Sequence, residues 1–323
     1  MKKLYFLFLL LIAGAVSYGQ TSVQNFGTIT GSHTSQTGSI SFLPNPTSGT
    51  TWARAGATAP AAPIYLETAS NPFGTTGAFV KAVASTSTSV SKFSPMVNYT
   101  PSKEFYTSFK VLFGDTNAGT TAITGIWSFY QGEGAMYSDA NDFAGAQVFA
   151  GIRFTFAASG LLSLNYRGGN AWITTNLSAT SFNQGQVYSI EIVGNNTINQ
   201  INYSYNGNAT SVAANTFDLY IDGNLIGNDL VKAGLPADTN IDRNTFTGIS
   251  STSNAANIFV DNVVVYNSIP SNVLSTVKNE IANFSLYPNP VKGGKVFINS
   301  ANNYAERSVA IFDVLGKQVV SQK

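Results

Sequence analysis

Short stretches in which apolar and polar residues alternate are the feature that most constrains how this chain can fold. In Glu104–Phe113, the residues at every second position from Phe105 are apolar apart from one threonine. Similar alternation runs through residues 151–156, 161–167 and 187–193. A period of two puts successive side chains on opposite faces of a β-strand, so each stretch predicts a strand with one buried face.

Turn signals separate these stretches and define the fold class. The sharpest is Asp222-Gly223, which lies between two apolar runs and has the sequence of a two-residue type I′ hairpin. The apolar stretch Ile258–Tyr266 predicts a final, deeply buried strand. Many short strands joined by such turns predict an all-β fold, a jelly-roll β-sandwich of two antiparallel sheets.

Composition narrows the function classes. Charged residues make up 10% of the 323 residues and the formal net charge is +1. Proteins that bind nucleic acid present a basic surface, so no nucleic-acid partner is expected. The chain has no cysteine, which excludes disulfides, thiolate nucleophiles and cysteine-bound metals.

The first residues have the order of a secretory signal. Two lysines precede an apolar run over residues 4–16, and small residues follow it. This order predicts a signal peptide over residues 1–19, with cleavage before Gln20. The run is shorter than the roughly 20 residues that a spanning helix needs, so we expect no membrane span in the mature chain.

A change in composition divides the mature chain. Residues 270–283 contain Pro, Ser and Asn with weak periodicity, which is typical of a linker between domains. We therefore expect the jelly-roll domain over residues 20–269 and a partial small β-sandwich over residues 284–323.

Two motifs fill the C-terminal segment. In "FSLYPNPVKGGKVFI", from Phe284, neither proline of Pro-Asn-Pro can donate a ladder hydrogen bond, which predicts a rigid turn before a strand. The second motif, "VAIFDVLGKQVV" from Val309, predicts a hairpin. The residues that carry the combined motif are Tyr287, Pro288, Asn289, Pro290, Asp313, Gly316 and Lys317.

Together these motifs resemble the type A C-terminal sorting domain of the type IX (Por) secretion system, found in Bacteroidota. The resemblance implies export to the periplasm, passage across the outer membrane by the type IX secretion machinery, and release or attachment at the outer cell surface. Members of that family continue past the Gly-Lys turn with further strands. We therefore expect residues 284–323 to be a partial sorting domain, most simply because the sequence is a fragment.

Few residues offer catalytic or metal-binding chemistry. The single histidine, His33, lies in a polar stretch that predicts a solvated loop, which argues against catalytic triads and histidine-bound zinc. Glu133, Asp139 and Asp142 cluster in a Gly-containing stretch that also predicts a solvated loop. We expect no metal or other cofactor, because the spacing of an EF-hand is lacking; calcium is the weaker alternative, since these oxygens suit it.

A candidate ligand site follows from the strand pattern. If the strands over 151–156, 161–167 and 187–193 pair antiparallel, their polar faces share one surface. Planar hydrogen-bonding groups beside aromatic rings are what a carbohydrate site uses. The plainer interpretation is a solvent-facing sheet with tryptophans in the core. The candidate ligand-binding residues are Arg153, Asn165, Arg167, Trp172, Glu191, Trp127 and Tyr130.

The hairpin "FDLYIDGNLIG" and the closing strand "NIFVDNVVVY" make the main domain similar to concanavalin A-like lectin/glucanase jelly rolls. That resemblance implies two stacked sheets and glycan binding on one face. The Glu-x-Asp-x-Glu string of its hydrolases does not occur here. We expect a non-catalytic glycan-binding or adhesive domain with a polysaccharide partner. The alternatives are a polysaccharide-degrading glycosidase or lyase using Glu133 or Glu191, and a purely structural surface protein.

Overall fold

The chain divides into two compact units, Met1–Thr276 and Val277–Lys323. The computed structural model describes residues 21–56, 62–86, 89–114, 123–134, 143, 145–251 and 256–273 of the first unit, and the backbone of residues 284–292, 295–300, 309–312 and 318–322 of the second. The predicted signal peptide lies outside these residues.

One large sheet of the first unit has nine strands. Their order is β17-β16-β13-β7-β19-β5-β4-β2, with β1 also paired to β19, and every pair is antiparallel. The strands are β1 (Thr21–Gln24), β2 (Gly31–His33), β4 (Ile64–Glu67), β5 (Phe79–Val83), β7 (Glu104–Phe113), β13 (Val187–Asn195), β16 (Thr216–Ile221), β17 (Asn224–Val231) and β19 (Asn257–Tyr266).

The other large sheet has eight strands. Their order is β11-β10-β9-β8-β18-β6-β3, with β12 also paired to β10, and again every pair is antiparallel. The strands are β3 (Thr50–Arg54), β6 (Ser91–Ser102), β8 (Gly125–Gly132), β9 (Val148–Phe156), β10 (Leu161–Gly168), β11 (Ala171–Ile173), β12 (Phe182–Asn183) and β18 (Ile241–Ile249).

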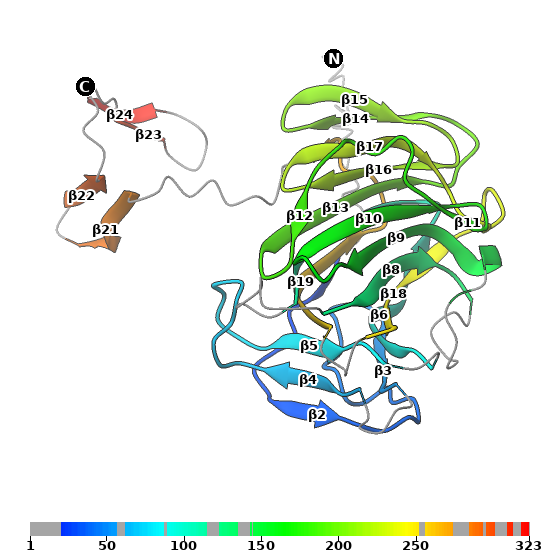
Figure 1. The fold of residues 1–323 in the computed structure, drawn as a ribbon. Coiled ribbons are helices and arrows are strands. Elements are labelled where there is room, and N and C mark those ends of the chain that lie inside the picture. Colours follow the sequence, from blue (N-terminus) through cyan, green and yellow to red (C-terminus); the bar gives the residue numbers. More distant parts are fainter. Residues whose placement is uncertain are drawn as a thin grey trace, which may run out of the picture. The chain divides into compact units, whose positions relative to one another are not determined.

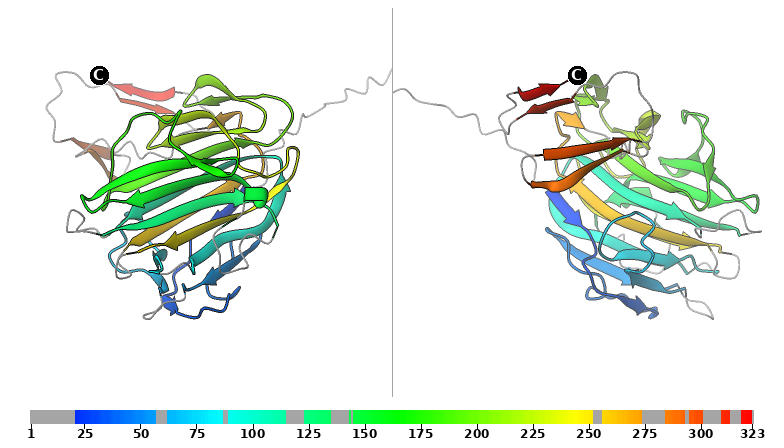
Figure 2. Two further views of the ribbon diagram at one scale, coloured as in Figure 1. Left: turned by 45° about the vertical axis from the view of Figure 1, so that its right-hand side comes forward. Right: turned by 90° about the vertical axis from the view of Figure 1, so that its left-hand side faces the viewer.

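The two sheets stack face to face as two layers (Figures 1 and 2). Aromatic rings from both layers meet between them: the ring centroids of Phe113 and Phe154 are 4.3 Å apart, and those of Phe109 and Phe129 are 4.6 Å apart. This packing follows from the alternation in the sequence, because each strand turns its apolar side chains to the same face. The main unit is therefore an all-β jelly-roll sandwich, as predicted.

Two local predictions are also confirmed. Strands β16 and β17 form an antiparallel hairpin, and its turn residues Asp222 and Gly223 both have positive φ, 49° and 76°. That combination is the one a type I′ turn requires. Strand β19 lies between β5 and β7 in the nine-stranded sheet, and most of its side chains are buried.

A third layer was not predicted. The three-stranded sheet β15-β14-β20 packs on the outer face of the nine-stranded sheet, which is the face turned away from the core. Its strands are β14 (Ile201–Tyr205), β15 (Asn208–Val212) and β20 (Asn272–Val273). Over the described ranges of the first unit, the only helical element is the short 3-10 turn η1 (Gly145–Gln147), and no helix is long and apolar enough to cross a membrane.

The second unit contains two antiparallel pairs, β21 (Phe284–Lys292) with β22 (Lys295–Ser300), and β23 (Val309–Phe312) with β24 (Gln318–Gln322). The second pair confirms the predicted hairpin, although Asp313, Gly316 and Lys317 lie outside the described residues. The prediction of a turn at Pro288–Pro290 is wrong, because these residues lie within the bounds of β21. The pairing of β21 with β22 is irregular between Tyr287 and Lys292. The two prolines lie in this part, so their lack of an N–H group removes no hydrogen bond between the strands.

Candidate functional site

The outer face of the eight-stranded sheet carries a continuous row of polar residues. Arg153 lies between the core residues Ile152 and Phe154, so its side chain belongs to the opposite face. Successive cross-strand pairs carry this row over β10, β9, β8, β18, β6 and β3, strands that lie side by side in Figure 1. We call this set the cationic row; it consists of Asn165, Arg153, Ser128, Thr247, Lys92 and Arg54.

Two arginines meet one tryptophan ring at the β10 end of this face. Trp172 on β11 is paired with Arg167 on β10. The guanidinium carbon of Arg153 lies 3.7 Å from the centroid of the Trp172 ring, and that of Arg167 lies 5.7 Å from it. Both distances are within the range of cation–π attraction. We call Arg153, Arg167, Trp172 and Asn165 the arginine–tryptophan site.

The ring of Trp172 reaches Arg153 across a gap in the side-chain surface. Gly151 on β9 has no side chain, and a Cβ there would lie 3.1 Å from Cβ of Arg167 and 3.2 Å from Cδ1 of Tyr130. The Tyr130 ring centroid is 6.0 Å from that of Trp172. The glycine therefore lets aromatic and guanidinium groups from neighbouring strands approach closely.

Hydrogen bonding differs between the two arginines. Arg153 Nε donates to Ser128 Oγ at 3.4 Å. Arg167 Nε is buried and has no hydrogen-bond partner among the described residues. Guanidinium groups prefer planar, paired contacts to carboxylate or phosphate-like oxygens. Of the two, Arg167 retains a donor that the described part of the protein does not use.

The middle of the cationic row is covered. The Lys92 side chain is fully buried, and its ammonium lies 4.3 Å from the centroid of the Phe143 ring. Phe143 also packs edge-on against Tyr130, with centroids 4.6 Å apart. At the far end, Arg54 Nη1 donates to the backbone O of Val90 at 3.2 Å. The partly solvent-accessible charged residues of the row therefore lie at its two ends, Arg153 at one and Arg54 at the other.

Sequence reasoning missed Lys92 and Arg54 as members of this face. The signal for Lys92 was present, because it directly precedes the core residue Phe93 in β6 and must face the other way. What the sequence lacked was the register that aligns β6 with β18, β8 and β9.

Three of the seven predicted ligand-binding residues have different surroundings from those expected. The predicted pairing of the strand over 187–193 with the strands around Arg153 is wrong: β13 lies between β7 and β16 in the nine-stranded sheet, so Glu191 does not join this face. Trp127 lies in the core, where its Nε1 donates to the backbone O of Ala256 at 2.9 Å. Tyr130 is on the same face as Arg153, but fully buried beneath Phe143.

Glu191 belongs instead to a buried cluster of carboxyl and phenol groups under the third layer. Its Oε2 accepts from the hydroxyl of Tyr106 at 2.9 Å, and its Oε1 from that of Tyr205 at 3.2 Å. Burial raises the pKa of Tyr106, and the nearby Glu191 charge raises it further. A carboxyl group with no exposed surface cannot contact a polysaccharide.

A second carboxyl group completes this cluster. Tyr203 donates its hydroxyl hydrogen to Asp218 Oδ2 at 2.6 Å, and its oxygen lies 2.8 Å from the hydroxyl of Tyr220. The backbone N–H of Asp229 donates to Asp218 Oδ1 at 2.7 Å. Burial raises the pKa of Asp218 to about 6, against the lowering effect of these hydrogen bonds. We call Tyr106, Glu191, Tyr203, Tyr205, Asp218 and Tyr220 the tyrosine–carboxyl cluster.

The other predicted polar groups do not form a metal centre in the described part of the chain, where no group of three His, Asp or Glu side chains could hold an ion. Glu133 donates its backbone N–H to the O of Gln147 at 3.0 Å, whereas Asp139 and Asp142 lie outside the described residues.

The prediction that His33 lies in a solvated loop is wrong, because His33 is the last residue of β2. Its ring packs on Phe42 at 5.4 Å, and burial lowers its pKa.

The fold shows that the main unit is a jelly-roll sandwich, and a match to a protein-family model identifies the C-terminal segment. Residues 285–323 match the model described as a secretion system C-terminal sorting domain. The chain therefore carries a type IX sorting domain, as predicted. It indicates handling by the type IX secretion machinery and secretion to the cell surface or the extracellular medium.

Solved structures resemble the main unit only distantly, and no curated protein sequence matches the chain. The alginate lyase Aly36B is 12% identical, with a TM-score of 0.37 over 59% of this chain and 82% of its own. The endo-β-1,4-glucuronan lyase from the fungus Trichoderma reesei is 12% identical, with a TM-score of 0.38 over 63% and 87%. The botulinum neurotoxin serotype D binding domain is 12% identical, with a TM-score of 0.39 over 78% and 48%. At these values the likenesses carry no argument about what this chain binds.

Proposed function

We propose that the jelly-roll domain is a non-catalytic module that binds an acidic polysaccharide outside the cell. The observation that carries this proposal is the gathering of two guanidinium groups on the Trp172 ring, on a solvent-facing part of a sheet. Secretion by way of the sorting domain brings such a module into contact with polysaccharides at the cell surface or in the medium.

The arginine–tryptophan site favours an acidic ligand over a neutral one. Arg153 and Arg167 place two positive charges beside one aromatic ring, and Arg167 Nε has no partner in the described part of the chain. Bringing two cations together costs electrostatic free energy, which an anionic ligand between them recovers. Carboxylate and sulfate groups have the planar or multi-oxygen geometry that guanidinium donors bind best.

Asn165 and Trp172 add contacts that do not depend on charge. Asn165 is the cross-strand partner of Arg153, so its amide lies beside the guanidinium. Amide groups bind sugar hydroxyls, and the exposed part of an indole ring packs on the C–H face of a sugar. The site thus combines charge recognition with sugar recognition on three adjacent strands.

Binding to matched polymers tests this proposal. We expect the protein to bind dextran sulfate, polygalacturonate or hyaluronan at least tenfold more tightly than uncharged dextran, as measured by calorimetry. Arg167→Ala should weaken binding of the acidic polymer by about 10- to 100-fold, because a charge-assisted hydrogen bond is lost. Trp172→Ala should weaken it as well.

Lys103→Ala is the matched control, because it removes one positive charge from a residue that pairs with Asp238 instead of facing the site. The affinity of the Lys103 variant for the acidic polymer should stay within about twofold of that of the unmodified protein, because solvent and salt screen exposed charges. Equal loss of affinity in the Lys103 and Arg167 variants would show that net charge alone drives binding. Failure to bind any of the acidic polymers would refute the proposal outright.

A further inference from the structure

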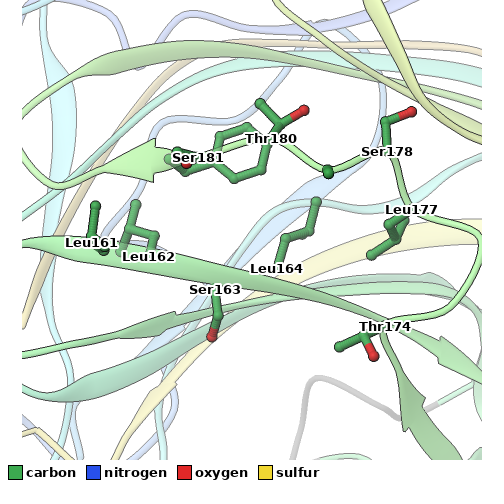
Figure 3. A pocket seen from close by; sticks show the side chains of 11 residues that line it. Leu161, Leu162, Ser163, Leu164, Thr174, Leu177, Ser178, Thr180 and Ser181 are labelled. Atoms are coloured by element: carbon green, nitrogen blue, oxygen red, sulfur yellow. The ribbon is translucent and has the colours of Figure 1, made fainter.

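A pocket of about 310 Å³ opens at the edge of the eight-stranded sheet, between β10 and the chain that links β11 to β12. In Figure 3 the side chains of Leu161, Leu162 and Leu164 point from β10 toward this linking chain, and Leu177 points back toward them. Ser163 points to the other side of the strand. The residues that line the pocket are Leu161, Leu162, Ser163, Leu164, Thr174, Leu177, Ser178, Ala179, Thr180, Ser181 and Phe182.

The pocket exists because a hydrogen-bonded ladder opens at one residue. Ala157 N–H donates to the O of Leu161, so the odd-numbered residues of β10 direct their backbone groups to β9, and the even-numbered ones direct theirs to the opposite edge. On that edge Leu162 is paired with Phe182, and Tyr166 with Ile173.

Leu164 lies between these two pairs. The register gives it no strand partner on the pocket side among the described residues, although continuing the ladder from Leu162 would place Thr180 opposite it. An N–H donor and a C=O acceptor of Leu164 are thus directed into the pocket wall.

The linking chain cannot easily close this gap, because it is fastened to the other sheet. Ser178 N–H donates to the O of Ile226 in β17 at 2.7 Å, and Ser178 Oγ donates to the O of Leu225 at 3.3 Å. Leu177 forms an isolated bridge with Gly227. These contacts hold the chain on the nine-stranded sheet, so the pocket is formed before any ligand arrives.

The chemistry of the lining selects the kind of ligand. No residue that lines the pocket carries a charge, and leucine side chains together with Phe182 form its apolar part. A ligand that fits must offer an acceptor to the N–H of Leu164, a donor to its C=O and a small apolar group to the leucines. A buried backbone pair left without such a partner costs free energy.

From this geometry we infer that the pocket binds the acetamido group of an N-acetylated amino sugar. The acetamido carbonyl would accept from the N–H of Leu164, the neighbouring ring hydroxyl of the sugar would donate to the O of Leu164, and the acetyl methyl group would pack on Leu162 and Leu177. The inference rests on the proposed function, because that function supplies the polysaccharide; Asn165 of the arginine–tryptophan site directly follows Leu164 in β10, and its side chain lies on the opposite face of the strand. The polysaccharide would then carry both acidic groups and N-acetylated sugars.

The size of the gap favours an acetamido group over an added peptide strand. Residues 162 and 166 are already paired, and four residues of a strand span only about 14 Å. Strand addition uses a row of backbone groups along an exposed edge. Here only one residue is available, which matches one acceptor and one donor of a small ligand.

Monosaccharides separate this inference from the proposed function, because they carry no acid. By saturation-transfer NMR and titration, the protein should bind N-acetylglucosamine about tenfold more tightly than glucose, as expected for one gained hydrogen bond and one small apolar contact. The methyl glycoside of 2-O-acetylglucose, whose ester carbonyl is a weaker acceptor than the amide carbonyl, should bind more weakly than N-acetylglucosamine. The acetyl methyl protons should receive the strongest saturation.

Ala179→Trp provides the protein variant, since Ala179 is exposed at the pocket and a large ring there would fill it. This variant should lose the preference for N-acetylglucosamine, whereas Ala209→Trp, at an exposed position of β15, should keep it. Equal affinity for glucose and N-acetylglucosamine, or an unchanged preference in Ala179→Trp, would overturn the inference. Tighter binding of an extended acetylated peptide than of the sugar would overturn it too.

The two proposals can fail separately. If acidic polymers bind but the two sugars are not distinguished, the pocket assignment is lost and the arginine–tryptophan site stands. If N-acetylglucosamine binds but no acidic polymer does, the proposed function is lost and the pocket keeps its ligand.

Discussion

At the scale of single residues, Gly194 shows how closely the sandwich is packed. It lies in β13 directly opposite Phe105 of β7, and a Cβ at this position would overlap the phenyl ring. Phe105 in turn packs edge-on against Phe149 of the other sheet, with ring centroids 5.6 Å apart. The missing side chain thus makes room for an aromatic contact between the layers.

We therefore expect Gly194→Ala to lower the free energy of unfolding by about 1–3 kcal/mol, since an overpacked core must shift a ring or the backbone. Chemical denaturation of the two proteins measures the difference. Gly31→Ala is the control, because a Cβ there would meet only one ring atom of Phe42, at 3.6 Å. A Gly194 variant as stable as the Gly31 variant would contradict this account of the packing.

Two tryptophans illustrate what a single position can and cannot reveal. Trp127 and Trp172 are both large aromatic residues next to an isoleucine, and both were candidates for ligand contact. Trp127 turned out to face the core beside Phe93, whereas Trp172 lies on the outer face beside Arg153. Residue type predicts aromatic packing in both cases; only the strand register decides which ring a ligand can reach.

At the scale of elements, the third layer is held to the nine-stranded sheet by hydroxyl groups as well as apolar contacts. Tyr203 of β14 reaches Asp218 of β16, and Tyr205 reaches Glu191 of β13. The rings of Tyr205 and Tyr220 stack with centroids 3.8 Å apart. Such contacts stabilise the layer only while each buried carboxyl oxygen keeps its donor.

Removing one hydroxyl group tests whether these hydrogen bonds stabilise the third layer. Tyr203→Phe leaves Asp218 Oδ2 buried without this donor, so the free energy of unfolding should fall by about 1–3 kcal/mol. Faster amide hydrogen exchange in β14 and β15 should accompany the loss. Tyr65→Phe is the comparison, since the structure shows no hydrogen bond from the Tyr65 hydroxyl among the described residues. If both variants unfold alike, the hydroxyl contacts do not hold the layer.

The strands also show why the sequence predicted the fold but only part of the candidate ligand site. Alternation around Phe105, Phe154 and Ile190 fixed which side chains face the core, because that depends on one strand alone. Pairing is a property of two strands, and nothing near Glu191 indicates that β13 joins β7 and β16. Glu191 also appeared solvent-facing because the covering strands follow it in sequence, without a local signal of where they fold.

By contrast, the prediction that one sheet surface carries Arg153, Asn165 and Arg167 is confirmed. Strands β9 and β10 are consecutive and joined by a short turn, which makes antiparallel pairing the simplest outcome. Trp172 follows in the next strand, β11. The predicted grouping thus held for β9, β10 and β11. It failed for Glu191, whose strand belongs to the other layer, and for Trp127 and Tyr130 of β8, which are buried.

At the scale of the whole molecule, burial of carboxyl groups should make stability depend on pH. Asp218 has its pKa raised to about 6, from an ordinary value near 3.8. The groups that face it are the phenols of Tyr203 and Tyr220 and the carboxyl of Asp229. In the pH range between the two pKa values, the folded protein holds a proton that the unfolded chain has released.

The sign of the effect follows from this difference in bound protons. Stability falls as pH rises wherever the folded state binds more protons, so the contribution of Asp218 is fully favourable below about pH 4 and lost above about pH 6. A difference of this size corresponds to roughly 3 kcal/mol. The pKa values of Asp222 and Asp261 are also raised, chiefly by burial, and add to the trend.

Denaturant unfolding between pH 4.5 and pH 7.5 measures the trend, and Asp218→Asn isolates its main source. The unmodified protein should lose stability as the pH increases, whereas the Asn variant, which has almost the same shape without the titrating group, should show a clearly shallower slope. The remaining slope should then come from Asp222, Asp261 and Glu104, whose pKa values burial raises, and it should be partly opposed by His33, whose pKa burial lowers. If instead the unmodified protein and the Asn variant showed the same dependence on pH, the pKa of Asp218 would not be raised in the folded state, and the account of its burial would be wrong.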